Sequence, residues 1–152
     1  MFEDIANPTA EEIRAWARNP ASMHPMQDWD LILSSIPEND GLYLELAGSD
    51  LPMADTFLRC LYIIFGDAVR TAWKTRSREQ VEGLVGHGLQ STDISVRKWA
   101  AAARGTLDRP DLFKVEDWIF GGAVSDEVSG YGGAATRRGG EVLERRNPLR
   151  ND

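Results

Sequence analysis

The chain of 152 residues has little of what most metal or disulfide sites need. It contains one cysteine, Cys60, and two histidines, His24 and His87. A single cysteine excludes an internal disulfide and a cysteine-based metal site, and two histidines cannot form a histidine cluster around a metal. We therefore expect no cofactor and no bound metal. Cys60 stands among apolar residues, which indicates a buried structural thiol.

The sequence also lacks the short motifs that mark common active sites. It has no G-x-S-x-G nucleophile elbow, no phosphate-binding loop that ends in Gly-Lys-Ser/Thr, and no G-x-G-x-x-G turn after a strand. Asp28 and Asp30 are two residues apart, so on a helix their side chains diverge and cannot share one ion. We therefore expect a protein that is not an enzyme.

Long apolar runs are absent as well. The most apolar run, residues 57–69, is interrupted by Arg59 and Asp67. It is shorter than the ~20 residues that cross a bilayer. The start, MFEDIANPTAEE, has neither the basic residues nor the apolar core of a signal peptide. These features predict a cytoplasmic protein with no membrane partner.

Basic residues are scarce in the first 66 positions, which hold three of them against eleven acidic ones, a balance of −8. Residues 67–152 carry a balance of +1. An acidic surface repels nucleic acid and attracts a basic partner protein. Plain solubility explains the same asymmetry, so the charge alone leaves both interpretations open.

One dense basic cluster stands at Arg70, Lys74, Arg76 and Arg78. Arg70 and Lys74 are one helical turn apart, so the pair suits a phosphate backbone. The alternative is that these cations complement a helix C-terminus or pair with the acidic N-terminal half. We favour this structural role, because the chain is too acidic for a typical nucleic-acid binder.

Hydrophobic spacing and capping residues predict an all-α fold with six to eight helices. The segments Thr9–Glu12 and Ser77–Gln80 are capping boxes, in which the first and fourth residues exchange side chain–backbone hydrogen bonds. Gly66-Asp67 is expected to kink or divide the most apolar helix, and the run 86–88 to end the next one. The helices are expected to begin near residues 9, 25, 42, 50, 77, 93 and 110.

The stretch from Asp93 to Leu107 has the most specific pattern. Its small and apolar residues at 96, 100, 103 and 107 share one helical face, where a second helix can approach closely. Residues 80–107 resemble a HEAT repeat, the helical hairpin that stacks into α-solenoids. The resemblance implies that Asp93 caps the second helix and that Arg97 reaches the acidic cap of an adjacent repeat. It also implies that the inward positions of the first helix are Val81, Leu84, Val85 and Leu89.

Two features depart from the repeat pattern. No second copy at a period near 40 residues is evident. The glycines at 83, 86 and 88 weaken the first helix by about 1 kcal/mol each relative to alanine. Stacked repeats and a single hairpin within an irregular helical domain therefore both remain open.

The composition changes at residue 121. Seven of the fourteen glycines fall in residues 121–152. We expect a helical domain over residues 1–120 and a flexible or loosely packed glycine-rich tail over residues 121–152.

These observations indicate a protein that binds another protein and carries no chemistry of its own. Small acidic chains rich in tryptophan and without a catalytic motif resemble bacterial toxin-immunity proteins and antitoxins in general character. That resemblance implies that the chain occludes the active site of a basic toxin domain. The partner-binding surface is predicted to combine carboxylates with a central aromatic residue: Glu11, Glu12, Asp28, Asp30, Asp50 and Asp55 with Trp29 or Tyr43.

Two alternatives remain. One is a helical adaptor or self-assembling scaffold, with an oligomeric state that the sequence does not set. The other is a nucleic-acid or phosphate-binding protein that uses the basic cluster of residues 70–78.

Overall fold

The computed structural model describes residues 2–119, which contain helices and no β-strand. The prediction of an all-α fold is therefore confirmed for this part of the chain. Residues 1–110 form one unit, and residues 111–152 form a second, of which residues 111–119 are described. The predicted tail, residues 121–152, and the predicted domain boundary at residue 120 lie outside the described residues.

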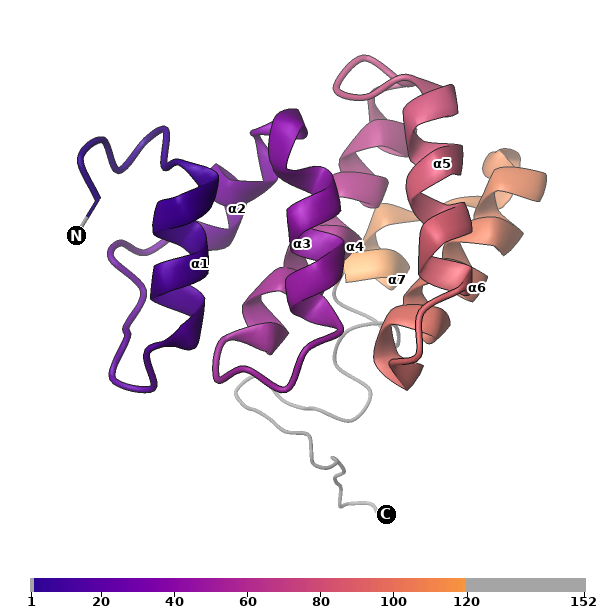
Figure 1. Cartoon of the computed structure of the whole chain (residues 1–152). Helices are drawn as coiled ribbons and strands as arrows, with labels where there is room; N and C mark the ends of the chain where they lie inside the picture. The colour runs from indigo at the N-terminus through magenta and orange to yellow at the C-terminus, as the bar shows by residue number, and fades with distance from the viewer. Residues whose placement is uncertain (1, 120–152) are drawn as a thin grey trace. The chain divides into compact units, whose positions relative to one another are not determined.

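The helices of the first unit pack mainly around α4. This helix contacts α2, α3, α5 and α6, and α5 lies beside α6 (Figure 1). The first unit contains α1 (Ala10–Arg18), α2 (Trp29–Ser34), η1 (Pro37–Asn39), α3 (Asp40–Ala47), α4 (Ala54–Arg70), α5 (Arg78–Leu89) and α6 (Ile94–Asp108). η2 (Pro110–Leu112) follows, and α7 (Val115–Ile119) lies in the second unit.

Side-chain caps start three of these helices where the sequence predicts them. At α1, the Thr9 hydroxyl accepts from the Glu12 N–H (3.1 Å), and the Glu12 carboxylate accepts from the Thr9 N–H (2.9 Å). Ser77 and Gln80 form the same pair at α5. At α6, the Asp93 carboxylate accepts from the N–H three residues later at 3.0 Å. Each cap satisfies backbone donors that have no partner within their own helix.

Two helices start later than predicted. The helix expected from Pro25 begins at Trp29, and the one expected from Asp50 begins at Ala54. Neither Pro25 nor Pro52 lies in the first turn of a helix; both precede it in bends and turns. The predicted division of this helix at Gly66-Asp67 is also wrong, because α4 continues unbroken to Arg70, and the alternative of a kink there stays a prediction. The short helix expected at residues 42–47 is confirmed by α3.

Aromatic side chains join the first four helices in one core. The Trp16 ring of α1 meets Trp29 of α2 and Phe57 of α4 edge-on, at centroid distances of 5.9 and 6.0 Å. Tyr43 of α3 stacks on Phe57 at 5.9 Å. Such offset and edge-to-face pairs are favourable beyond the area they bury. The core of this half of the unit therefore depends on aromatic residues from four helices.

The helical hairpin of α5 and α6 is present, and the predicted inner face of α6 is buried at Val96, Ala100, Ala103 and Leu107. Two expectations are wrong. Leu89 remains 38% exposed at the end of α5. Arg97 donates to the Ser91 carbonyl of its own hairpin at 2.8 Å instead of an acidic cap in another repeat. Membership of the HEAT family stays a prediction.

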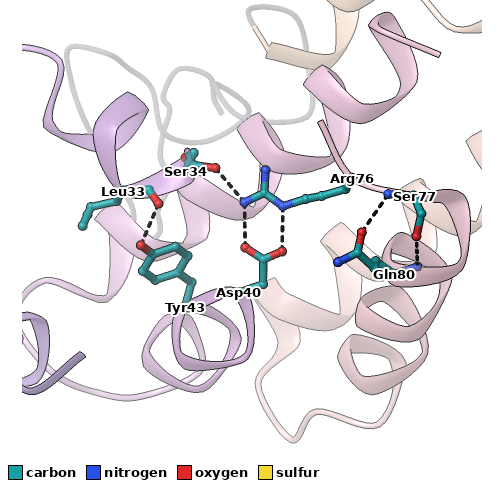
Figure 2. Close-up of polar contacts among 7 residues, drawn as sticks. All are labelled: Leu33, Ser34, Asp40, Tyr43, Arg76, Ser77 and Gln80. Carbon is teal, nitrogen blue, oxygen red and sulfur yellow. Dashed lines mark hydrogen bonds and ion pairs between the residues drawn. The ribbon is translucent and has the colours of Figure 1, made fainter. Parts of the chain in front are cut away.

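A buried ion pair joins segments far apart in the sequence (Figure 2). Arg76, in the loop before α5, donates through Nε and Nη2 to the two oxygens of Asp40, each at 2.8 Å. Its Nη2 also donates to the Ser34 carbonyl at the end of α2, at 2.7 Å. Burial raises the pKa of the Asp40 carboxyl, and the hydrogen bonds from Arg76 act in the opposite direction. The pair ties α2, α3 and the loop before α5 together.

The C-terminus of α4 is a Schellman motif without glycine. After the C-cap Thr71, Ala72 has φ 55° and Trp73 has φ 69°. The Ala72 N–H donates to the Val69 carbonyl (3.1 Å), and the Trp73 N–H donates to the Ala68 carbonyl (2.7 Å). These two bonds define the motif and require a left-handed residue after the C-cap. A side chain at that position costs roughly 1–2 kcal/mol in backbone energy.

Replacing Ala72 by glycine is expected to raise the free energy of unfolding by about 1 kcal/mol, because glycine adopts positive φ without a Cβ clash. Ala72 is exposed, so no packing is lost. The exposed Ala102 within α6 supplies the control, and Ala102→Gly should lower the free energy of unfolding by about 1 kcal/mol. Urea denaturation followed by circular dichroism measures both changes. A destabilised Ala72→Gly variant would contradict the assignment of strain to this residue.

Candidate protein-binding surface

The connection between α1 and α2, residues 19–28, has no helix but is held in place at its backbone. The Trp16 indole N–H donates to the Met23 carbonyl at 3.0 Å. The Ser22 hydroxyl donates to the Trp16 carbonyl at 2.8 Å, and the Ser22 N–H donates to the Asn19 carbonyl at 3.0 Å. The loop therefore has a defined path across the end of α1.

His24 attaches the same loop to α4. Its Nε2 lies 3.1 Å from the Thr56 hydroxyl, and its ring lies 5.8 Å from the Trp16 ring. Partial burial lowers the pKa of His24, while the nearby Asp30 acts in the opposite direction. The neutral imidazole therefore predominates at neutral pH, and the loop and the first turn of α4 form one region.

This region presents three large apolar side chains to solvent. Met23 is 78% exposed although its carbonyl is hydrogen-bonded, Met26 is 40% exposed, and Leu31 on α2 is 50% exposed. All three fall within residues 23–31 of the chain, and exposed apolar residues that stand near one another mark interaction sites more often than single ones do. We call Met23, Met26 and Leu31 the methionine patch.

Three of the predicted acidic residues stand in the same region. Asp28 is exposed at the start of α2, and Asp55 is exposed in the first turn of α4. Asp30, on α2, is partly buried. An Asp30 oxygen lies 3.9 Å from the Arg59 guanidinium of α4, which joins α2 to the first half of α4. The methionine patch therefore has carboxylates on the segments that carry it.

The other predicted acidic residues do not belong to this region. Glu11 is exposed on α1, and Asp50 is exposed between α3 and α4. No hydrogen bond or ion pair among residues 2–119 joins either of them to the loop. Glu12 has a structural role, because its two oxygens accept from the N–H groups of Thr9 (2.9 Å) and Glu3 (3.0 Å). These hydrogen bonds lower the pKa of Glu12.

The two aromatic residues predicted to contact the partner lie in the core of the isolated chain, so their contact with a partner stays a prediction. Trp29 and Tyr43 are both 0% exposed. Trp29 packs against Phe2 and Trp16, and the Tyr43 hydroxyl donates to the Leu33 carbonyl at 2.6 Å. Both lie on the buried faces of their helices, α2 and α3.

The methionine patch was not predicted from the sequence. Met23 precedes the helix predicted from residue 25, in a segment with two prolines, Pro20 and Pro25. A large apolar residue in such a segment is exposed unless something covers it, and this was the signal that could have identified Met23. Met26 gave no such signal, because it fell inside the predicted helix.

The basic cluster is largely engaged in the fold. Arg70 pairs with Asp67 at 2.9 Å, and Arg76 is buried on Asp40. Arg78 pairs with Glu82 (3.0 Å), donates to the Leu107 carbonyl (2.7 Å) and lies over the Trp73 ring. The expectation that these cations complement the helices and pair with the acidic half is confirmed for Arg76. Such pairing leaves fewer cations available for a phosphate backbone.

The described residues also answer three narrower questions, on the Cys60 thiol, on metal-binding clusters and on membrane-spanning helices. Cys60 is buried, and burial raises its pKa to about 12, so the thiol stays protonated. In residues 2–119 no three His, Cys, Asp or Glu side chains lie close enough together to hold a metal ion. None of the helices in this part of the chain is both long and apolar enough to span a membrane.

Comparison with known proteins assigns no family to the chain. No family model matches the chain, and neither the curated proteins nor the solved structures contain a significant match.

Proposed function

We propose that this protein is a non-enzymatic protein-binding domain that contacts its partner through the methionine patch and the carboxylates beside it. The observation that carries the proposal is Met23, which stands 78% exposed on a loop whose backbone is fixed by Trp16. A loop that is already ordered loses less conformational entropy on binding. Methionine is flexible and polarizable, so it adapts to an apolar pocket on another protein.

The partner in this proposal is a basic protein. The first 66 residues have a balance of −8. Asp28 is exposed on the segment that carries the patch, and Asp55 is exposed next to Thr56, which contacts His24 of the loop. Carboxylates at the rim of an apolar contact steer a basic partner and set its orientation. Occlusion of the active site of a basic toxin domain, as by an immunity protein or antitoxin, fits this combination best.

A toxin-like product of the neighbouring gene provides the test. Co-expression of the present chain should rescue cells from that product, and the purified pair should form a complex. Without rescue and without a complex the immunity role is wrong. A large defined oligomer in light scattering, in the absence of any partner, would instead support the self-assembling scaffold.

Replacing Met23 by alanine is expected to weaken the complex about tenfold or more, ~1.4 kcal/mol, because truncation of a central contact residue removes its packing. Isothermal titration calorimetry measures the change. Ile94→Ala is the matched control, since Ile94 is also an exposed apolar residue (60%) but lies on α6. If Ile94→Ala weakens binding and Met23→Ala does not, the interface lies on the hairpin and the methionine patch is excluded.

A further inference from the structure

The segment before α1 lies over the core with one aromatic side chain. We call residues 2–8 the N-terminal strap. The Phe2 ring is half-buried and lies 5.0 Å from the Trp29 ring, tilted by 56°. Residues 3–7 are all exposed, and Pro8 is buried where the chain enters α1. The strap therefore contacts the core at its two ends and is solvated between them.

Few bonds hold the strap to the rest of the described structure. The Glu3 N–H donates to the Glu12 carboxylate at 3.0 Å. The other hydrogen bonds given by strap N–H groups are local: Ala6 and Asn7 both donate to Asp4. Within residues 2–119, the first residues of the strap are therefore held by one hydrogen bond, one ring contact and the partial burial of Phe2. Segments with so few contacts open locally without global unfolding.

Beneath the strap lies the aromatic core described above. Trp29 is 0% exposed, and its ring meets Phe2 of the strap and, edge-on, Trp16. Among the residues that the structure describes, the Trp29 indole N–H has no hydrogen-bond partner. Buried donors usually have a partner, so this one is an exception in the core. Only burial protects this N–H from exchange with water, which makes it a direct reporter of local opening.

We propose that the N-terminal strap is a displaceable cover and that the Trp29 ring beneath it binds an aromatic side chain of a partner segment in place of Phe2. The chemistry of the occupant follows from Phe2 itself, an aromatic side chain whose ring lies against the Trp29 ring. The proposal rests on the proposed protein-binding function and adds a second contact to it. Trp29, predicted from the sequence to meet the partner, would do so after the strap has moved.

Hydrogen exchange of the indole N–H groups, followed by NMR on the full chain, tests the cover without any partner. Trp99 is the internal control, because it is also 0% exposed and its N–H also lacks a hydrogen-bond partner, but it lies in the hairpin. Trp29 should exchange at least about tenfold faster than Trp99 if local opening of the strap suffices. Equal rates for the two would show that only global unfolding exposes Trp29 and would overturn the proposal.

A variant then isolates the ring contact. Phe2→Ala should accelerate exchange at Trp29 by about tenfold relative to the unaltered chain and leave exchange at Trp99 unchanged. Ile5→Ala, in the solvated part of the strap, should change exchange at neither tryptophan. Protection at Trp99 shows that the variant is folded. An acetylated peptide of residues 2–8, FEDIANP, added at about millimolar concentration should restore protection of Trp29 in the Phe2→Ala variant. A peptide with alanine in place of its phenylalanine should not. If neither peptide restores protection, the Trp29 ring is not a binding site.

Discussion

Replacing Asp40 by alanine is expected to lower the free energy of unfolding by about 3–5 kcal/mol, because the change leaves a buried guanidinium without its counter-ion. The Arg76 side chain is 4% exposed and that of Asp40 16% exposed, so water is a poor replacement for the lost carboxylate. Of the three hydrogen bonds that it donates, only the one to the Ser34 carbonyl remains. Urea denaturation followed by circular dichroism measures the loss.

An exposed ion pair of the same first unit supplies the matched control. Arg14 and Glu45 also form a short contact, 2.8 Å, but both side chains are largely solvated. Glu45→Ala should therefore lower the free energy of unfolding by less than about 1 kcal/mol. A similar small loss for Asp40→Ala would mean that water screens Arg76 and that the pair is not buried in solution.

A double variant separates the value of the pair from the penalty of breaking it. Asp40→Leu combined with Arg76→Met removes both charges and keeps much of the volume. Buried pairs replaced in this way are often neutral or more stable, by about 1–4 kcal/mol. Most of the loss in Asp40→Ala should therefore be recovered. Without recovery, the pair contributes more than charge balance, through its link between Ser34 and the start of α3.

Local features of the fold were predictable because their causes lie within a few residues. Thr9 and Glu12 are three residues apart, and the cap they form depends on the backbone between them. The same holds for Ser77 and for Asp93. The inner face of α6 was also predictable, because the 3.6-residue period places its small residues in one line.

Contacts between distant segments were not predictable in the same way. Arg76 and Asp40 are 36 residues apart, and nothing in the spacing of either identifies the other. The start of α2 was misplaced because the backbone bonds of Trp16 and Ser22 hold residues 19–28 as a loop. The candidate site was affected most, since burial of Trp29 and exposure of Met23 both depend on how α1, α2 and α4 meet.

The three glycines of α5 could not be told apart from the sequence either, because helix propensity predicts that each of them weakens the helix equally. A Cβ atom added at Gly83 or Gly86 would have no neighbour within 4 Å. At Gly88 it would lie 2.9 Å from the Ala100 Cβ and 2.9 Å from the Trp99 ring. Gly88 is therefore the residue that lets α5 approach α6 closely, and Gly83 and Gly86 are not needed for that approach.

Gly88→Ala is accordingly expected to lower the free energy of unfolding by about 1–3 kcal/mol, because a rigid methyl group and a fully buried ring would both have to move. Gly83→Ala and Gly86→Ala should each raise it, by up to about 1 kcal/mol, through helix propensity alone. Urea denaturation of the three variants compares the same chemical change on one helix, so the difference in sign isolates the contact with α6. A Gly88→Ala variant as stable as the other two would contradict the close approach and mean that the hairpin separates at little cost.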